Sequence, residues 1–345
     1  MWGCPSTSFL RPQMLVEHSH LDPCPVLLTF PRISRDRPYN RRAHPACSDE
    51  VSCSAVALCS DRGESRSTIF QTTGRWPVAC SLQRGMMQIR PGVEVASLSD
   101  VGCQRENNED ALSYWEPQSD DQFQQKGRLA LVADGMGGYE GGQEASRLAV
   151  DTIRDVYDRD PSGNLQDALI TGFRTAHERI RQYAESHPEL LGMGTTCTAV
   201  ALNDLHLYFA HVGDSRLYLV RGETISRLTR DHSYVGRLVE SGVLSSDEAE
   251  RHPQRHILTA ALGAGGEVTA DAPDGPMTLN DGDILVLCTD GLWGLVQEAE
   301  ILKIVSSHDA SAACAELVKL ARQRGGPDNI TLQVLRLSNN GRSRT

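Results

Sequence analysis

The sequence has few lysines and no long hydrophobic run. Only three of its 345 residues are lysine, and the formal net charge is −11. Because no basic excess is available to neutralise phosphates, the composition argues against a generic nucleic-acid or anionic-membrane binder. A membrane-spanning helix needs about 18 or more consecutive apolar residues, and no such run is present. The sequence therefore predicts a soluble protein that binds neither nucleic acid nor membrane.

The ten cysteines lack the spacings that accompany zinc binding or thiol catalysis. There is no paired C-x-x-C, so a reduced, cytoplasmic chain is the default expectation. No cysteine has an arginine six positions on, which excludes the Cys-x5-Arg loop of cysteine-dependent phosphatases. A P-loop is also missing, since GMGGYEGG is followed by Gln143 and Glu144 where Lys and Ser or Thr are needed.

The composition changes near residue 85. Residues 1–85 hold six cysteines and no lysine, and ten Arg against seven acidic residues give a charge of +3, which leaves −14 for residues 86–345. This upstream part is dense in Pro, Arg and Ser and keeps no regular periodicity, so we expect little packed structure. We predict that residues 1–85 form a low-order, dispensable or non-native extension, that the natural start is Met86 or Met87, and that residues 86–340 form a catalytic domain.

The second part combines groups of strands with two long helical patterns. Strands are predicted at 93–99, 128–133, 196–203, 205–212, 216–221, 224–228, 283–289 and 329–336, and helices at 142–158, 164–186, 230–242, 298–307 and 309–324. Asn203-Asp204 is typical of a hairpin turn, which indicates antiparallel pairing. Because strands do not alternate strictly with helices, the pattern favours an α+β fold with helices outside antiparallel sheets over a doubly wound parallel fold.

Acidic residues stand at the ends of several predicted strands. Asp134 and Asp290 each follow an apolar strand and precede a glycine, Asp328 precedes a strand, and Asp214 links two strands. An Asp-Gly pair alone is a common turn, but four acidic strand ends on one rim would repel each other and require protons or a cation. Because the ligands offered are oxygens, Mg²⁺ or Mn²⁺ fits better than zinc.

A charged stretch after the first strand supplies further candidate residues. SDVGCQRENNEDAL contains Arg105, Glu109 and Asp110. The planar fork of an arginine is suited to binding a phosphate bidentately. Two metals about 3.5–4 Å apart activate a water for phosphoester hydrolysis. Asp134 would then bridge both metals, and Gly135 would let its carbonyl approach one of them.

Eight motifs in order resemble those of the metal-dependent, protein phosphatase 2C-like serine/threonine phosphatases. They are SDVGCQRENNEDAL, LVADGMGGYEGGQEAS, GMGTTCTAVAL, HVGDSRLYLVR, LTRDHS, HPQRHILTAALG, LCTDGLWGLV and GGPDNITLQVL, which together span about residues 92–337. The form DGMGG is similar to the bacterial branch. The resemblance implies a four-layer α-β-β-α sandwich, two antiparallel sheets flanked by helix pairs, with two Mn²⁺ or Mg²⁺ ions per catalytic domain.

The resemblance also implies roles for individual residues. Asp134 would bridge the metals, the Gly135 carbonyl would bind one, and Asp290 and Asp328 would bind the other. By the same resemblance, Glu109 and Asp110 would support metal-bound water, Arg105 would bind the phosphate, and Asp214 would bind a third, weaker metal.

Three residues depart from the family pattern, and one segment matches its variable part. Met136 stands where animal members carry a histidine proposed as the general acid, Tyr139 stands where many bacterial members have histidine, and Gly294 takes an often acidic position. Residues 230–256 match the mobile flap of bacterial members. We expect His232, His252 and His256 to be surface or packing residues rather than catalytic ones.

The predicted reaction is hydrolysis of phosphoserine or phosphothreonine in proteins. Phosphorylated proteins and a cognate Ser/Thr kinase are the expected partners, and the protein is expected to be a monomer. A metallonuclease would share the metal chemistry, but the charge of −14 disfavours a polyanionic substrate. A pseudophosphatase, a binding module with the same fold, would be expected to lack metal ligands, whereas Asp134, Asp290 and Asp328 are all present.

Overall fold

The structure is a computed structural model that describes residues 53–58, 90–137, 141–245, 248–249 and 251–338. Its strands are β1 Cys53–Leu58, β2 Val93–Asp100, β3 Asp110–Trp115, β4 Arg128–Met136, β5 Gly194–Thr195, β6 Cys197–Asn203, β7 His206–Val212, β8 Arg216–Arg221, β9 Thr224–Arg227, β10 Met277–Thr278, β11 Ile284–Cys288 and β12 Ile330–Leu337. Its α-helices are α1 Asp120–Lys126, α2 Gly141–Arg159, α3 Leu165–Ser186, α4 Tyr234–Glu240, α6 Asp290–Trp293, α7 Glu298–Ser307 and α8 Ala310–Gln323.

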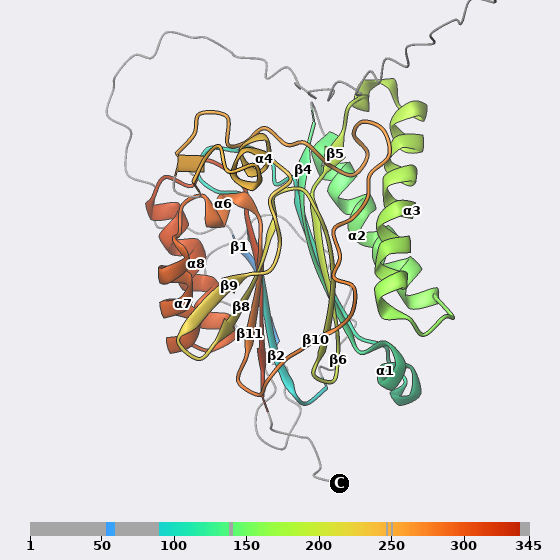
Figure 1. The fold of residues 1–345 in the computed structure, drawn as a ribbon, viewed down its shortest axis with the longest axis vertical. Helices are drawn as coiled ribbons and strands as arrows, with labels where there is room; N and C mark the ends of the chain where they lie inside the picture. Colours follow the sequence, from blue (N-terminus) through green and yellow to red (C-terminus); the bar gives the residue numbers. More distant parts are fainter. Residues whose placement is uncertain (1–52, 59–89, 138–140, 246–247, 250, 339–345) are drawn as a thin grey trace, which may run out of the picture.

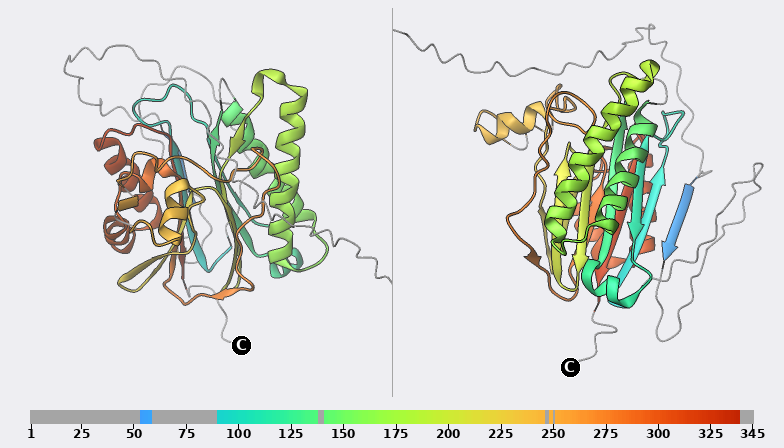
Figure 2. Two further views of the ribbon diagram at one scale, coloured as in Figure 1. Left: turned by 45° about the horizontal axis from the view of Figure 1, so that its top comes forward. Right: turned by 90° about the vertical axis from the view of Figure 1, so that its right-hand side faces the viewer.

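The strands form two antiparallel sheets that face each other (Figure 1). One sheet has the order β1-β2-β12-β11-β8-β9, and the other has the order β10-β7-β6-β4-β3, with β5 paired to β4. Helices α2 and α3 cover the second sheet, and α7 and α8 cover the first (Figures 1 and 2). This is the predicted α+β sandwich of four layers, α-β-β-α.

Side-chain caps fix where the long helices begin. The Asn164 side chain accepts hydrogen bonds from the backbone N–H groups of Gln166 and Asp167 at the start of α3. Asp309 accepts one from Ala312 at the start of α8. Such caps satisfy N–H groups that have no partner within the helix. Each helix then packs an apolar face on its sheet.

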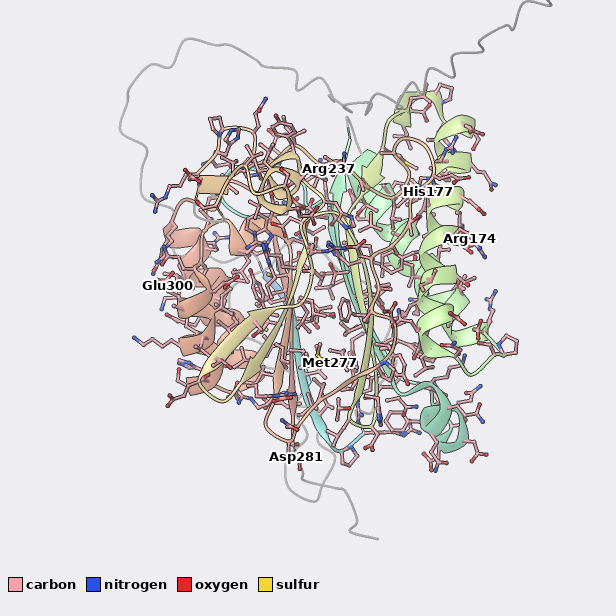
Figure 3. All side chains as sticks on the ribbon, viewed as in Figure 1. Arg174, His177, Arg237, Met277, Asp281 and Glu300 are labelled. Atoms are coloured by element: carbon pink, nitrogen blue, oxygen red, sulfur yellow. The ribbon has the colours of Figure 1, made fainter. Side chains whose placement is uncertain are left out.

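The space between the sheets is apolar in its middle and polar at one end. Leu285 and Leu287 of β11 and Ala130 and Val132 of β4 belong to the core between the sheets, and Figure 3 shows side chains filling this space. Successive side chains of a strand point to opposite faces, so Asp134 continues the row of Ala130 and Val132. The strand period therefore carries an acidic residue from the core out to the end of the sandwich.

All eight predicted strands and four of the five predicted helices are confirmed, with shifts of a few residues at their ends. The helix predicted at 230–242 is shorter, because α4 begins only at Tyr234, where the Ser233 side chain accepts the N–H of Gly236. The β6–β7 turn is Asp204-Leu205 rather than Asn203-Asp204, and Asp204 takes a φ of 56°.

Several elements were not predicted. They are β1, β3, β5, β10, α1 and α6. β1 lies within the segment expected to be of low order and pairs antiparallel with β2 over its whole length. The rest of residues 1–85 lies outside the described residues. Among the described residues, no helix is long and apolar enough to cross a membrane.

Candidate metal centre

Five acidic residues lie near one another at one end of the sandwich. This end carries α4 and α6 and is the top in Figure 1. Asp110 and Asp134 stand opposite each other in the β3–β4 pair. Asp290 is the first residue of α6, directly beyond β11. Asp328 lies two residues before β12, and Asp214 lies in the loop between β7 and β8. The structure thus brings Asp134, Asp214, Asp290 and Asp328, the acids at the predicted strand ends, close enough to influence one another, with Asp110 beside them.

Asp134 does not lie in a turn, contrary to the turn geometry that the Asp-Gly pair suggests. β4 continues through Gly135 and Met136, and Gly135 is paired with Thr195 of β5. A Cβ on Gly135 would lie 2.1 Å from the carbonyl oxygen of Gly142 in α2. Glycine is needed here because two backbones meet without room for a side chain.

Asp290 and Gly291 likewise start the short helix α6 instead of forming a turn. A Cβ on Gly291 would lie 1.9 Å from the carbonyl oxygen of Asn329. The same dipeptide therefore serves two different local structures, and in both the glycine lets a neighbouring backbone come close to the aspartate.

Backbone and hydroxyl groups hold the main chain of Asp134. Its N–H donates to Thr196 Oγ1 (3.0 Å), and its carbonyl oxygen accepts bonds from the Thr195 hydroxyl (2.8 Å) and the Thr196 N–H (2.9 Å). None of these bonds uses the carboxylate, so the side chain is left to face the other acids.

Burial and the neighbouring acids raise the pKa of three of these residues, Asp110, Asp134 and Asp214. Burial raises the pKa of Asp110 from 3.8 to about 7, with further contributions from Asp290 and Asp328, although the Thr331 and Thr289 hydroxyls lower it. The pKa of Asp134 is raised well above its usual value by burial first and then by Asp110, Asp290 and Asp214. Asp110 and Asp134 are partly accessible to solvent yet densely surrounded by protein. Burial and Asp290 raise the pKa of Asp214 in the same way.

The side chains of Arg105 and His256 contact the cluster from its rim. The Arg105 guanidinium donates to Asp328 Oδ2 at 2.8 Å. His256 Nδ1 lies 3.4 Å from Asp290 Oδ2. Among the described residues, no three His, Cys, Asp or Glu side chains form a closed metal cluster. Each of these contacts uses one carboxylate oxygen, Oδ2 of Asp328 and Oδ2 of Asp290.

The donor set fits a hard divalent cation. Its side-chain ligands are carboxylate oxygens, the ligand type that Mg²⁺ and Mn²⁺ prefer. The ionised forms of neighbouring carboxylates that are surrounded by protein are disfavoured, and a bound cation stabilises them. The residues able to hold such ions are Asp134, Asp290, Asp328, Asp214 and the carbonyl of Gly135.

Asn329 fixes the loop that carries Arg105 and Glu109 next to Asp328. Its Oδ1 accepts the N–H of Glu109 (2.8 Å), and its Nδ2 donates to the carbonyl oxygens of Val101 and Asn107. Burial raises the pKa of Glu109, whereas Arg105 lowers it. The Asn329 side chain therefore holds this loop beside Asp328 through three hydrogen bonds.

A profile of the family described as Protein phosphatase 2C matches residues 96–237. The chain is also 35% identical over 251 residues to the protein phosphatase PhpP of Streptococcus pneumoniae, a match that covers 71% of this chain and 98% of PhpP. The chain belongs to the protein phosphatase 2C family. The family and fold expected from the motifs are thus confirmed.

Solved structures of this family match the whole domain. The crystal structure of the Mycobacterium tuberculosis serine/threonine phosphatase PstP/Ppp is 34% identical, with a TM-score of 0.64, and the match covers 72% of this chain and 100% of that one. The catalytic domain of PstP in complex with two manganese ions is 32% identical, with a TM-score of 0.62, 72% of this chain and 99% of that one being covered.

The structure describes two of the three residues that depart from the protein phosphatase 2C pattern. Met136 is the last residue of β4, and its thioether cannot donate a proton. Gly294 is the C-cap residue directly after α6, and its N–H donates to the Asp290 carbonyl oxygen (2.8 Å). Tyr139 lies outside the described residues.

The histidines also differ in their surroundings. His211 is buried between the sheets and bonded to Thr198, and burial lowers its pKa to about 4, so its role is structural. His232 accepts the Gly213 N–H. His252 and His256 have the spacing His-x-x-x-His. His256 lies against Asp290, whereas His252 Nδ1 accepts the N–H of Gln254.

Residues that support the acids were missed at the sequence level. Thr289, which donates to Asp110 Oδ2 (2.9 Å), and Asn329 directly adjoin the acidic residues Asp290 and Asp328. Their positions next to the acids, in TDG and PDN, could have indicated that they support the site. The contacts of Arg216 and Trp293 join segments far apart in the chain, and no local pattern predicts them.

Proposed function

We propose that this chain is a metal-dependent serine/threonine protein phosphatase that hydrolyses phosphoserine and phosphothreonine in proteins. The enzyme class follows from membership of the protein phosphatase 2C family, whose relative PhpP is matched over 98% of its length. The observation that carries the mechanism is the convergence of five carboxylates at one end of the sandwich, with the pKa values of Asp110, Asp134 and Asp214 raised.

Two Mn²⁺ or Mg²⁺ ions, when bound, would supply the charge that lowers the pKa of a water and stabilises the oxygens of the phosphate. Asp134 lies between the other acids and is suited to contact both ions. Asp290 and Asp328 would hold one ion, and the Gly135 carbonyl would help to hold the other. Asp214 is assigned to a third, weaker ion.

The remaining residues would bind the phosphate and order the water. Arg105 presents a guanidinium at the rim of the cluster, where it pairs with Asp328 in the absence of substrate. Glu109 and Asp110 would accept hydrogen bonds from the attacking water. Met136 cannot protonate the leaving group, so that proton would come from solvent or from another residue.

The wider assignments rest on the relatives and the composition. Phosphoproteins are the substrates, and a cognate Ser/Thr kinase would supply them in a bacterial signalling pathway. The cysteine pattern supports a cytoplasmic location. We also propose that the protein is a monomer, that residues 230–256 act as a flap, and that residues 1–85 are dispensable.

The test is hydrolysis of p-nitrophenyl phosphate and of a phosphothreonine peptide by the full chain, with Mn²⁺ or with EDTA. We expect turnover with Mn²⁺ only, and a loss of at least about 100-fold in kcat for Asp134→Asn and Asp290→Asn, since each removes charge that stabilises the transition state. Asp309→Asn is the matched control, because asparagine caps α8 as well as aspartate does. Turnover in EDTA, or full activity of either site variant, would refute the mechanism. Metal binding without turnover would indicate a pseudophosphatase.

A further inference from the structure

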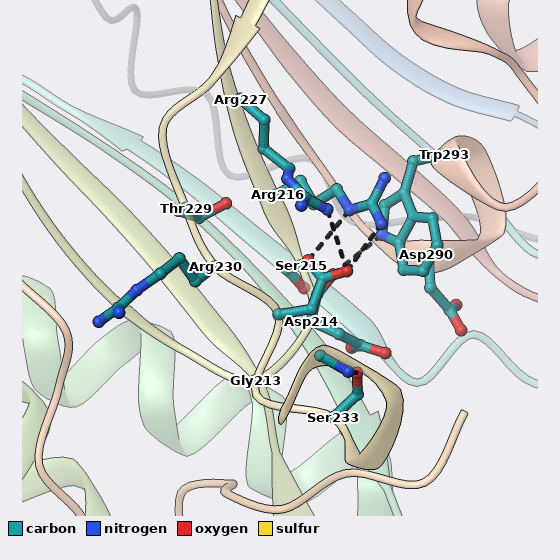
Figure 4. Close-up of polar contacts among 12 residues, drawn as sticks. Gly213, Asp214, Ser215, Arg216, Arg227, Thr229, Arg230, Ser233, Asp290 and Trp293 are labelled. Carbon is teal, nitrogen blue, oxygen red and sulfur yellow. Dashed lines mark hydrogen bonds and ion pairs between the residues drawn. The ribbon is translucent and has the colours of Figure 1, made fainter. Parts of the chain in front are cut away.

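Arg216, the first residue of β8, links three segments that build the site end of the sandwich (Figure 4). One is the loop that carries Asp214. Another is α6, which begins with Asp290 and ends with Trp293. The third is the segment 227–231, which leads into α4. The buried Arg216 side chain contacts Trp293 of α6 and Asp231 of the segment 227–231, and Trp293 in turn contacts the main chain of Asp214.

The Arg216 side chain is held on every side of its guanidinium. Nε donates to Asp231 Oδ1 (3.1 Å) and Nη2 donates to Asp231 Oδ2 (2.7 Å), which forms a bidentate pair. Nη1 donates to the Tyr218 hydroxyl (3.0 Å). The side chain is only 5% exposed, so this ion pair is shielded from solvent. A buried pair of this kind orients its partners because leaving either charge alone is costly.

Trp293 passes this constraint on to Asp214. The guanidinium carbon of Arg216 lies 3.6 Å from the centre of the Trp293 ring, a close cation–π contact. The indole Nε1 donates to the backbone carbonyl oxygen of Asp214 at 2.9 Å. Trp293 is three residues after Asp290 in the same helix. The placement of the indole therefore relates the backbone of Asp214 to the helix that carries Asp290.

Asp231 extends the same constraint to the segment before α4. It also pairs with Arg227 (3.2 Å), and a Cβ on Gly236 of α4 would lie 2.3 Å from the Asp231 carbonyl oxygen. α4 thus packs directly against the main chain of Asp231. The first helix of the 230–256 segment rests on the residue that Arg216 binds.

We propose that Arg216 is a positioning residue that, through Trp293 and Asp231, fixes the separation of Asp214 and Asp290 and thereby sets the affinity of this part of the site for a divalent cation. The inference deepens the proposed phosphatase function and rests on it. Arg216 itself would contact neither metal nor substrate.

The contacts of Arg216 require arginine rather than any cation. Lysine would keep the positive charge but lose the planar fork that binds both Asp231 oxygens and the flat face that stacks on the indole. Trp293→Phe makes a narrower change, because it keeps an aromatic ring for stacking and removes only the N–H that binds the Asp214 carbonyl oxygen. The two variants test the two links separately.

The experiment is calorimetric titration of the metal-free full chain with Mn²⁺, together with the Mn²⁺ dependence of p-nitrophenyl phosphate hydrolysis. For Arg216→Lys we expect the Kd of the weakest Mn²⁺ ion to rise by at least about tenfold, since charge-assisted bonds are the stronger ones. For Trp293→Phe we expect a rise of about twofold to tenfold, the range that one neutral hydrogen bond gives. At saturating Mn²⁺, KM should change by less than about twofold.

Arg221→Lys is the matched control. Arg221 ends the same strand and makes a bidentate pair with Asp283, remote from the acidic cluster. It should leave the Mn²⁺ titration unchanged even if the thermal stability falls. A role of Arg216 in stability alone would behave like this control, with a lower Tm and an unchanged Mn²⁺ Kd.

The inference is overturned if folded Arg216→Lys and Trp293→Phe bind Mn²⁺ within twofold of the wild type. If Arg216→Lys fails to fold, Trp293→Phe decides the matter alone. A wild-type chain that binds Mn²⁺ without phosphatase activity would overturn the proposed function, whereas the calorimetric comparison would still test Arg216.

Discussion

At the scale of single residues, Gly135 is constrained as strongly as the acids beside it. It lies in the middle of the contact between β4 and the start of α2, and its N–H donates to the carbonyl oxygen of Glu109 (3.2 Å). The carboxylate of Asp134 can stand at the inner face of the sheet because the next residue occupies almost no space. The functional residue and the glycine form one unit.

Gly135→Ala should therefore destabilise the protein. The added methyl group would lie 2.1 Å from the Gly142 oxygen and 2.5 Å from the Glu109 oxygen, which are backbone atoms that cannot swing aside. We expect a loss of about 1–3 kcal/mol or more in unfolding free energy, as overpacking gives, together with weaker Mn²⁺ binding. Denaturant unfolding measures this. Gly275→Ala, where nothing lies within 4 Å, is the control. Equal stability of the two variants would contradict the prediction.

Arg105 should act mainly in substrate binding. It is 44% exposed on its side chain and is paired with Asp328, so the guanidinium is at the rim, with access to a phosphate. We expect Arg105→Ala to raise KM for a phosphothreonine peptide by about tenfold or more, the value of a lost charge-assisted bond, with a smaller fall in kcat. Steady-state kinetics at saturating Mn²⁺ separate the two parameters. Arg324→Ala, which breaks the exposed pair with Glu300, should change neither. An unchanged KM would remove Arg105 from the phosphate site.

At the scale of elements, the sequence predicted what the hydrophobic period controls and missed what tertiary contacts control. The apolar runs of β4 and β11 have clear ends, so the placement of Asp134 and Asp290 at those ends was predictable. β3 begins with Asp110 and follows a polar loop, and only its pairing with β4 reveals it as a strand. α6 has a single turn, too short for any periodicity. The tie between Asn329 and the loop before β3 spans more than 200 residues and has no local signal.

Asp110 of β3 and Asp134 of β4 should make the stability of the metal-free protein fall as the pH rises. The pKa of Asp110 is raised to about 7, and that of Asp134 is also raised, so the folded chain binds protons more tightly than the unfolded chain. This stabilising contribution is complete below about pH 4 and is lost as the pH rises to about 7. A divalent cation compensates the ionised carboxylates. We expect Mn²⁺ to raise Tm little at pH 5 and clearly more at pH 7.5.

Thermal unfolding in EDTA and in Mn²⁺ across this pH range provides the measurement. Asp110→Asn is the comparison, because the amide resembles the protonated acid in size and charge. In EDTA its stability relative to wild type should increase from pH 5 to pH 7.5. A difference between the two proteins that stays constant with pH would refute the assignment of the titration to this pair.

At the scale of the whole molecule, the side chains that stabilise the sandwich and those that form the site lie in different parts of it. Leucine and valine side chains fill the middle of the space between the sheets, and the acids, threonines and arginines gather at the end near α4 and α6. Every acidic residue of the site comes from residues 109–328. The family profile matches residues 96–237 within this range, and we propose that the catalytic unit lies within residues 90–338.

Removal of residues 1–85 should therefore leave catalysis intact and affect only one sheet edge. β1 pairs with β2 along its whole length, and β2 becomes an edge strand when β1 is removed. We expect kcat and KM within about twofold of the values for the full chain, since no site residue is lost. We expect a lower Tm, because backbone groups of β2 that are hydrogen-bonded to β1 would be hydrogen-bonded to water instead. A chain that starts at residue 53 retains β1 and should recover the Tm of the full chain. If residues 86–345 fold but lose activity, the upstream segment contributes to the site, and if both truncated chains share the same Tm, β1 adds no stability.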